Sequence, residues 1–319
     1  MNVSISVLIT YFNEGILLKE CLDSLLNQTI QPAEILVYDD ASDLPAQEFI
    51  SPDYPVKVIR SEVNRGPAFG RNQLLELSQC EYVHFQDADD LFCPDWYEQV
   101  QMAILATQAD IVITEVSSVT EGTFVSEKII CVEWLLDNTR DLIIFCLMNF
   151  ILPASTTFRR KLALKIGGYR TREILPQSED FDFHIRLAAT GATYTAIPNP
   201  LIIQRLRSNS HSRNKKLCLT SALTATCLLS KELPSQYLPY LAEVSARIGS
   251  NLFSLNAYSE AREAFQVARQ LGSPMFSHRK GIYQLIARLI SQETAEQFGV
   301  WYRQTLPVSV RKIIGKQGL

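Results

Sequence analysis

Hydrophobic residues in the first third of the chain alternate between two spacings. Near-continuous apolar stretches predict strands, whereas apolar residues three or four apart predict amphipathic helices. We expect strands at 3–10, 34–40, 56–60, 81–86 and 110–114. We expect helices at 14–28, at 68–78 and from Pro94 to about 107. Strands that are apolar throughout are typical of a mainly parallel sheet with helices on both faces, so the pattern predicts a Rossmann-like α/β fold.

The pattern changes twice after residue 114. Over 115–212 it is less regular, with a strand entering a helix over 155–169 and a helix over 178–191 for which Ser178 is the N-cap candidate. A strand candidate near Pro198 runs into a polar loop. From 213 the apolar spacing indicates helices separated by prolines. We therefore predict a domain over 1–212, with halves 1–114 and 115–212, and an α-helical C-terminal region over 213–319.

Composition excludes some protein classes. Of the 319 residues 47% are hydrophobic and 20% charged, as in globular proteins. The net charge of −4 argues against nucleic-acid binding through overall positive charge. Seven scattered cysteines without a C-x-x-C pair indicate free thiols in a reducing compartment. The N-terminus resembles a strand, not a signal peptide, and no apolar run reaches the ~20 residues that span a bilayer. We expect a cytoplasmic protein.

The C-terminus has a charge pattern of its own. Residues 297–319 contain no acids, but they contain Arg303, Arg311, Lys312 and Lys316 among apolar side chains. A basic, apolar segment of this kind can lie on an anionic membrane surface. An end surrounded by solvent is the alternative. Peripheral contact with the inner face of the membrane therefore stays open at this point.

Polar residues follow three of the predicted strands: Asn13 and Glu14, then Asp39 and Asp40, then Asp87, Asp89 and Asp90. Ligands bind at the carboxyl ends of parallel strands, so these groups should meet at one edge of the sheet. Helix capping accounts for one acid of the third group, but not for three. A hard divalent cation relieves the repulsion between such carboxylates and shares its remaining positions with substrate phosphates. We expect Mg²⁺ or Mn²⁺ here.

Two further acidic stretches have alternative interpretations. In "YDDASD", a carboxylate can accept hydrogen bonds from a nucleotide base or ribose, but Asp and Ser also form turns. In "SEDFDFHIRL", acids open a helix, and Asp182 with Arg186 forms an i,i+4 pair that needs no catalytic role. Neither stretch alone distinguishes a functional site from an ordinary turn or helix start.

Six motifs together resemble family 2 glycosyltransferases, which have the GT-A fold. They are "SISVLITYFNEGILLKECLDSLLNQT", "EILVYDDASD", "NRGPAFGRNQ", "HFQDADDLF", "FRRKLALKIGGY" and "SEDFDFHIRLAATG", in the order and spacing typical of that family. The resemblance covers about residues 3 to 212. It implies transfer of a sugar from a nucleotide diphosphate sugar, most often UDP-linked, to an acceptor hydroxyl with inversion. A carbohydrate or lipid-linked acceptor in polysaccharide or glycolipid synthesis would fit.

The resemblance also implies residue roles. For the donor nucleotide it implies Thr10 and Phe12 at the base, Asp40 reading the base, and Arg71 near the diphosphate, with Asn13, Glu14 and Asp39 at the same edge. For the metal it implies Asp87 and Asp89, with Asp90 as a rival to Asp87. For catalysis it implies Asp180 as general base, with Glu179 beside it.

Two positions depart from the family pattern. Phe12 stands where the family usually has Tyr, and it keeps the stacking face of the ring. Thr10 stands where many members have Pro. Arg207 stands where many members have a loop His, and His211 follows four residues later. Arginine cannot bind a cation, but it can hold a diphosphate by two hydrogen bonds. The altered loop favours one alternative, a sugar-nucleotide-binding scaffold with little or no turnover. A dinucleotide dehydrogenase is disfavoured because no G-x-G-x-x-G follows the first strand.

Overall fold

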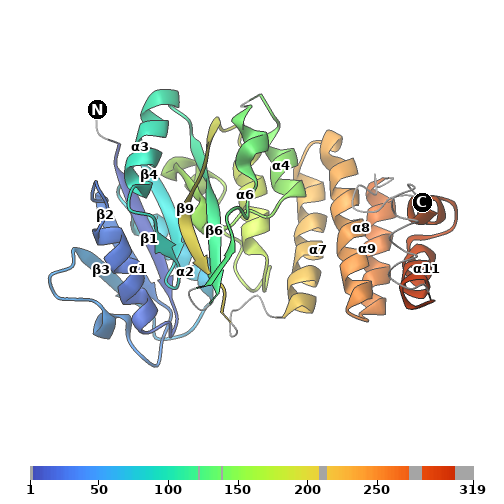
Figure 1. The fold of residues 1–319 in the computed structure, drawn as a ribbon, viewed down its shortest axis with the longest axis horizontal. Coiled ribbons are helices and arrows are strands. Elements are labelled where there is room, and N and C mark those ends of the chain that lie inside the picture. Colours follow the sequence, from blue (N-terminus) through green and yellow to red (C-terminus); the bar gives the residue numbers. More distant parts are fainter. Residues whose placement is uncertain (1–2, 121–122, 138, 208–213, 273–281, 306–319) are drawn as a thin grey trace. The chain divides into compact units, whose positions relative to one another are not determined.

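The computed structural model describes residues 3–120, 123–137, 139–207, 214–272 and 282–305. The chain divides into two compact units, Met1–Arg213 and Asn214–Leu319. Figure 1 shows that the first unit holds the strands, whereas the second consists of helices. The candidate site lies in the first unit.

The elements of the first unit follow the predicted alternation over residues 3–114. The strands are β1 (Ile5–Tyr11), β2 (Glu34–Asp39), β3 (Val56–Arg60), β4 (Tyr82–Asp87), β5 (Leu91–Phe92), β6 (Ile111–Thr120), β7 (Thr123–Ser126), β8 (Thr156–Arg159) and β9 (Tyr194–Arg205). The α-helices are α1 (Ile16–Leu26), α2 (Pro67–Leu77), α3 (Trp96–Thr107), α4 (Leu142–Met148), α5 (Arg160–Lys165) and α6 (Glu179–Ala188). Short 3₁₀ helices within the described residues of this unit are η1 (Ala46–Phe49), η2 (Val132–Leu136) and η3 (Pro153–Ser155). Strand β6 continues beyond its predicted end at 114.

The strands form one sheet in the order β3-β2-β1-β4-β8-β6-β9-β5, and β7 pairs with β6. Strands β3, β2, β1 and β4 are parallel to one another, as are β6 and β9. The exception in the middle is β8, which runs antiparallel between β4 and β6. Strands β5 and β7 also pair antiparallel, with β9 and β6 respectively. The predicted mainly parallel sheet is therefore confirmed, but local spacing did not indicate that β8 would run antiparallel in its middle.

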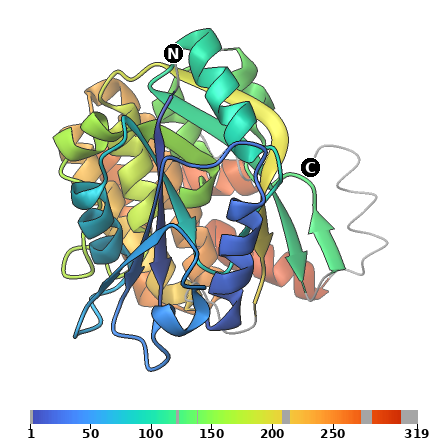
Figure 2. The same cartoon turned by 90° about the vertical axis from the view of Figure 1, so that its left-hand side faces the viewer.

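Helices cover both faces of this sheet, as Figure 2 shows. On one face, α1 and α3 lie together, because the Gln28 side chain accepts a hydrogen bond from the backbone of Tyr97. Trp96 is fully buried there against His84, which comes from β4. On the other face, aromatic rings join the sheet to α6. They are Phe85, Phe158, Tyr169 and Phe183. This second apolar layer packs α6 against the sheet, and the first residues of α6 belong to the candidate site.

The second unit is α-helical, as predicted. Its helices are α7 (Lys215–Glu232), α8 (Leu238–Ser254), α9 (Tyr258–Leu271), α10 (Ile282–Leu289) and α11 (Gln292–Thr305). Close packing of α8 on α9 requires Gly249, since a Cβ there would lie 2.4 Å from a ring atom of Phe265. None of the helices within the described ranges combines the length and apolar character needed to cross a membrane. Residues 306–319, part of the predicted membrane-contact segment, lie outside those ranges.

Candidate active site

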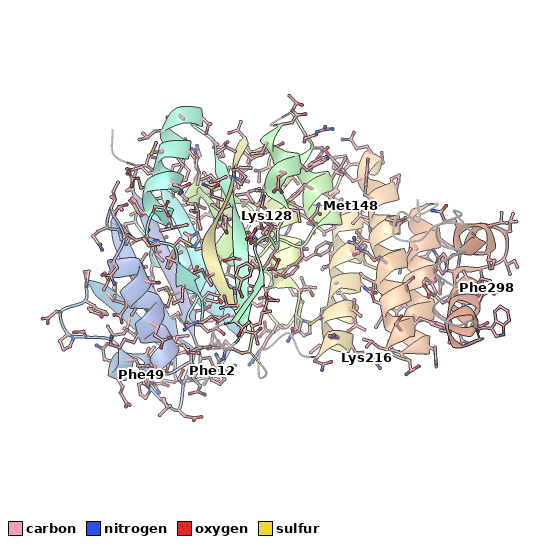
Figure 3. The ribbon with its side chains drawn as sticks, viewed as in Figure 1. Phe12, Phe49, Lys128, Met148, Lys216 and Phe298 are labelled. Atoms are coloured by element: carbon pink, nitrogen blue, oxygen red, sulfur yellow. The ribbon has the colours of Figure 1, made fainter. Side chains whose placement is uncertain are left out.

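Residues after three parallel strands meet at one edge of the sheet. Thr10 in β1 is opposite Tyr38 in β2 and Asp87 in β4, so the three strands end at the same level. Figure 3 labels Phe12, which follows β1 at this edge. The predicted convergence of the polar residues that follow β1, β2 and β4 is therefore present.

Arg71 connects three elements at this edge. Its Nη2 donates to Asp87 Oδ1 at 2.9 Å, and its Nη1 donates to Glu179 Oε1 at 2.8 Å. The Arg71 side chain is only 6% exposed. The ring of Tyr169 lies 5.3 Å from the guanidinium carbon. One arginine of α2 thus links an acid that ends β4 with the first residue of α6.

The neighbours of Arg71 in α2 explain how it is placed. A Cβ on Gly70 would lie 2.7 Å from the ring of Tyr38, so glycine allows α2 to approach β2 closely. On the other side, Asn72 Nδ2 donates to the Tyr169 carbonyl at 2.8 Å, and its Oδ1 accepts from the Tyr169 amide at 2.7 Å. The helix is therefore fixed to the sheet and to the segment before α6.

Asp89 and Asp90 have different surroundings. Asp89 Oδ2 accepts from Arg207 Nη1 at 3.2 Å, and the Asp89 side chain is 25% exposed. Asp90 is buried, and its Oδ1 accepts from the Arg205 amide at 2.9 Å. Burial, and then the charge of Asp87, raise the pKa of Asp89, and they raise that of Asp90 well above its ordinary value. Asp90 thus ties the end of β9 to the acidic loop, whereas Asp89 stays accessible.

Glu14 belongs to the same acidic cluster. Burial, together with the charges of Asp89 and Asp87, raises the pKa of Glu14 to about 7. Its carboxylate accepts a hydrogen bond from the Phe12 amide. Phe12 is 39% exposed, so a face of its ring is open to a ligand. The loop after β1 therefore brings both an acid and an aromatic ring to the cluster.

Asp39 and Asn13 organise the loop that follows β2. Asp39 is buried, and its carboxylate accepts hydrogen bonds from the amides of Ser42 and Ala46 and from Arg60 Nη1. Asn13 has φ of 63° and accepts a hydrogen bond from the Asp43 amide at 2.8 Å. The side chains of Asp39 and Asn13 are therefore both hydrogen-bonded within the protein. Their predicted contact with a nucleotide stays a prediction.

Asp40 joins the end of β2 to the start of α2. Its Oδ1 accepts from the Arg65 amide at 2.9 Å, and its Oδ2 accepts from the Gly66 amide at 2.7 Å. Thr10 lies beneath this junction, because a Cβ on Gly70 would be 3.3 Å from its methyl carbon. Asp40 holds the backbone before α2 in place, and its predicted reading of a base remains untested.

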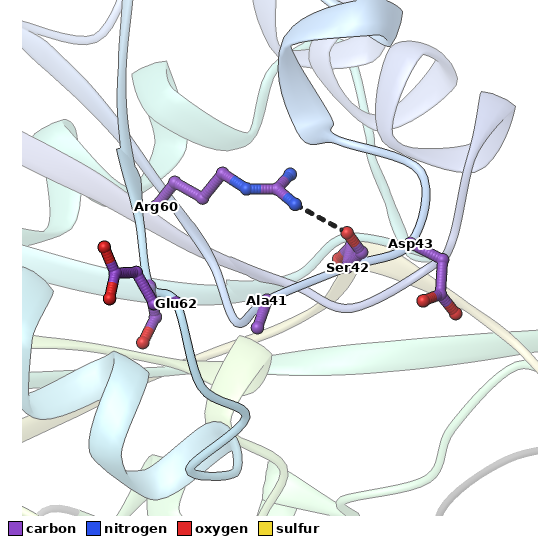
Figure 4. Close-up of a pocket in the computed structure, with 6 residues that line it drawn as sticks. Ala41, Ser42, Asp43, Arg60 and Glu62 are labelled. Carbon is purple, nitrogen blue, oxygen red and sulfur yellow. Dashed lines mark hydrogen bonds between the residues drawn. The ribbon is translucent and has the colours of Figure 1, made fainter.

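A pocket opens beside this junction, at the ends of β2 and β3. Its volume is about 580 Å³. It is lined by Ala41, Ser42, Asp43, Arg60, Ser61 and Glu62, which Figure 4 shows. Arg60 Nη2 donates to the Ser42 carbonyl at 2.7 Å, which supports one wall. Acidic and basic side chains both line the pocket, so it suits a polar ligand.

Asp180 is the second residue of α6, directly after Glu179. Burial, and then the charge of Glu179, raise the pKa of Asp180 to about 7, against the lowering effects of the Phe181 amide and Arg71. Asp182 differs, because it is fully buried between Arg170 and Arg186. The i,i+4 pair expected as an alternative thus exists, but it involves Asp182 and not Asp180.

Ser178 precedes α6 as its N-cap residue, as predicted, although not in the predicted manner. It has φ of 58°, and its hydroxyl makes no capping hydrogen bond to the helix. The left-handed conformation turns the chain sharply before Glu179. The backbone conformation, and not the hydroxyl, therefore sets the start of α6.

The oxygen ligands at the edge fit a hard divalent cation. Asp87 and Asp89 come from one loop, and carboxylate oxygens are the ligands that Mg²⁺ prefers. Within the described part of the chain, no group of three His, Cys, Asp or Glu side chains could hold a metal ion unaided. A pair of carboxylates completed by substrate phosphates is the arrangement expected for Mg²⁺ or Mn²⁺.

Three residues of this site were not predicted from the sequence. They are Asn72, Tyr169 and Arg205. "GGY" does contain a signal for Tyr169, because consecutive glycines at positive φ, as at Gly167 and Gly168, mark a sharp turn before a fixed side chain. Arg205 is the last residue of β9, and Arg207 lies two residues beyond it. His211 lies outside the described residues.

The sheet order, the helices on both faces and the acids at the carboxyl edge define a GT-A-type fold. The chain belongs to glycosyl transferase family 2, whose family model matches residues 6–167. EpsH of Bacillus subtilis is 33% identical over 124 residues, which are 38% of this chain and 36% of EpsH. This chain therefore matches only about a third of that relative's length.

Solved structures support the same fold. TarS of S. aureus, residues 1–349, in complex with UDP-GlcNAc superposes with a TM-score of 0.73 at 19% identity, covering 96% of this chain and 93% of that one. The mannosyltransferase PcManGT of Pyrobaculum calidifontis, in complex with GDP-Man and Mn²⁺, gives 0.60 at 17% identity, covering 93% and 84%. The predicted GT-A fold and family 2 membership are confirmed.

Proposed function

We propose that this chain is an inverting glycosyltransferase that moves a sugar from a nucleotide diphosphate sugar to an acceptor hydroxyl. The observation that carries the proposal is the meeting of Asp87, Arg71 and Asp180 at one edge of the sheet. A UDP-linked donor is favoured, since TarS was solved with UDP-GlcNAc. A scaffold without turnover is disfavoured because the acids and the candidate base are kept together.

Asp180 is the proposed general base. The acceptor oxygen forms a bond to the anomeric carbon on the face opposite the diphosphate, and the bond from that carbon to the diphosphate oxygen breaks. The diphosphate leaves with the electron pair, and Asp180 takes the acceptor proton. The transition state has oxocarbenium-ion character. A pKa near 7 suits a base that works at neutral pH, because the carboxylate is then both available and able to hold a proton.

Asp87 and Asp89 are the proposed holders of Mn²⁺ or Mg²⁺, and the PcManGT complex with Mn²⁺ supports this choice. Such an ion, when bound, offsets the charge of the leaving diphosphate as a Lewis acid. Arg71 supplies a fixed positive charge beside Asp87. Arg207 lies against Asp89, where it can hold a phosphate oxygen in place of the family's loop His.

The nucleotide is proposed to lie along the ends of β1, β2 and β3. The exposed ring of Phe12 can stack on the base, with Thr10 and Asp40 beside it. Asn13, Glu14 and Asp39 shape the surrounding loops. The pocket beside Arg60 offers further polar contacts to the base or ribose. The acceptor, a carbohydrate or a lipid-linked sugar, would be bound by residues within 115–212.

Release of UDP tests this function. Wild type, Asp180→Asn and Asp53→Asn are incubated with Mn²⁺ and a panel of UDP-sugars and acceptors. We expect Asp180→Asn to lower kcat about a hundredfold or more, the contribution of a general base. Asp53 is an exposed acid in a loop, so its Asn variant should match wild type. Equal rates for Asp180→Asn and wild type would contradict the assignment. Metal-dependent UDP binding without turnover over the whole panel would favour the scaffold.

A further inference from the structure

The guanidinium of Arg71 is held on three sides. Two carboxylates accept its hydrogen bonds, Asp87 at 2.9 Å and Glu179 at 2.8 Å. The ring of Tyr169 covers it at 5.3 Å. Tyr169 cannot give way easily, because its ring stacks on Phe183 at 3.9 Å and its backbone is bonded to α2. Arg71 therefore has one orientation in the free protein.

The two carboxylates that bind Arg71 have different roles in the proposed function. In the proposed function, Asp87 binds the cation and faces the diphosphate, so its contact with Arg71 must change when the donor arrives. Glu179 is not a proposed metal ligand, and its side chain is 15% exposed. Its Oε1 accepts from Arg71, and charge-assisted hydrogen bonds of this kind are stronger than neutral ones. Glu179 is thus the anchor of Arg71 that the donor does not compete for.

We propose that Glu179 is a positioning residue, which holds Arg71 for the donor diphosphate and sets the charge around the base Asp180. This inference rests on the proposed function. It gives Glu179 a role different from that of a second base, because its carboxylate is already bound to a buried arginine. A single residue at the start of α6 would then connect donor binding with proton transfer.

The electrostatics around Asp180 give this proposal a signature. The titratable and charged groups that face Asp180 are Glu179 and His184 from α6, Arg71 from α2, Asp87 from β4, and Tyr169 from the segment before α6. Glu179 raises the pKa of Asp180 by like-charge repulsion, whereas Arg71 lowers it. Removing the charge of Glu179 should therefore lower the pKa of Asp180. The base would then stay ionised at a lower pH.

The experiment compares Glu179→Gln, Glu179→Asp and a control, Glu76→Gln. Glu76 is an exposed residue of α2, so its variant removes one acid without touching the site. The pH profile of kcat/KM is measured with Mn²⁺ and a UDP-sugar, since this profile reports the free enzyme's base. Calorimetry measures UDP binding with Mn²⁺, which does not require turnover. Wild type and Asp180→Asn are run alongside.

Glu179→Gln should move the acid limb of the profile to lower pH. It should also weaken UDP binding about tenfold, the size expected for loss of one charge-assisted hydrogen bond. Glu179→Asp keeps the charge but shortens the side chain, so it should keep the wild-type limb and still weaken UDP binding. Glu76→Gln should match wild type in both measurements.

Wild-type pH profile and UDP affinity in Glu179→Gln would overturn the proposal. So would equal losses in Glu179→Gln and Glu179→Asp with the same shift of the limb, because only one variant loses the charge. If Glu179→Gln fails to fold, Glu179→Asp decides by whether UDP affinity falls while the limb stays. Absence of transfer by wild type would contradict the proposed function instead, and the calorimetry would then decide the anchoring of Arg71 alone.

Discussion

At the scale of single residues, three neighbouring acids differ in how far their side chains are exposed, and we propose different roles for them on that basis. The side chains of Asp87 and Asp89 are 36% and 25% exposed, whereas Asp90 is 4% exposed and bound to the Arg205 amide. Asp90 also has a pKa raised well above its ordinary value, first by burial. A buried carboxyl group that already accepts a backbone hydrogen bond is less available to a cation than an exposed one. We therefore predict that Asp87, and not Asp90, binds the cation together with Asp89.

Asparagine variants test this division, because they keep the shape and remove the charge. We expect Asp87→Asn and Asp89→Asn to abolish the Mn²⁺ dependence of UDP binding, and Asp90→Asn to retain it. Calorimetric titration of UDP with and without Mn²⁺ measures the difference. Asp90→Ala, which leaves the Arg205 amide unpaired, should cost about 1–3 kcal/mol of stability. Loss of Mn²⁺ dependence in a folded Asp90→Asn would show that the assignment is wrong.

At the scale of elements, α2 shows how far a sequence alone can go. Apolar spacing predicted the helix to within a residue at each end, and "GRN" indicated Arg71 by family resemblance. The spacing did not reveal that Asn72 would hold the backbone of Tyr169, because that contact joins residues 97 positions apart. For the same reason, the position of β8 between β4 and β6 was not predicted. Local periodicity predicts elements, but long-range pairing depends on packing.

Gly70→Ala tests the close approach of α2 to the sheet. A Cβ would lie 2.7 Å from Tyr38 and 3.3 Å from Thr10, so the helix must move outward. We expect a loss of about 1–3 kcal/mol in the free energy of unfolding, typical of overpacking. Displacement of Arg71 should also weaken UDP binding. Urea unfolding and calorimetry measure both effects, with Glu76→Ala as the exposed control on the same helix. An unchanged midpoint of unfolding would mean that α2 is more loosely packed than the distances indicate.

At the scale of the whole molecule, the site should make the free protein less stable as pH rises. Asp180 and Glu14 each have a pKa near 7, above the ordinary values of 3.8 and 4.5. Because the folded state holds these protons more tightly, their stabilising contribution is complete below about pH 4 and is lost as pH rises through 7. Each pKa unit corresponds to about 1.4 kcal/mol, which partial exposure to solvent reduces.

Asp180→Asn removes one of these titrations and therefore measures it. Between pH 5 and 8 the melting temperature of wild type should fall relative to that of Asp180→Asn by about 4 °C, corresponding to roughly 2 kcal/mol after screening. The comparison cancels carboxylates elsewhere in the chain, including Asp23 and Glu133, whose lowered pKa values act in the opposite direction. Scanning calorimetry of both proteins over this range provides the measurement, and Asp53→Asn should follow wild type. Parallel curves for wild type and Asp180→Asn would mean that Asp180 is already ionised at pH 5, which would also remove the reason for expecting a base that works near neutral pH.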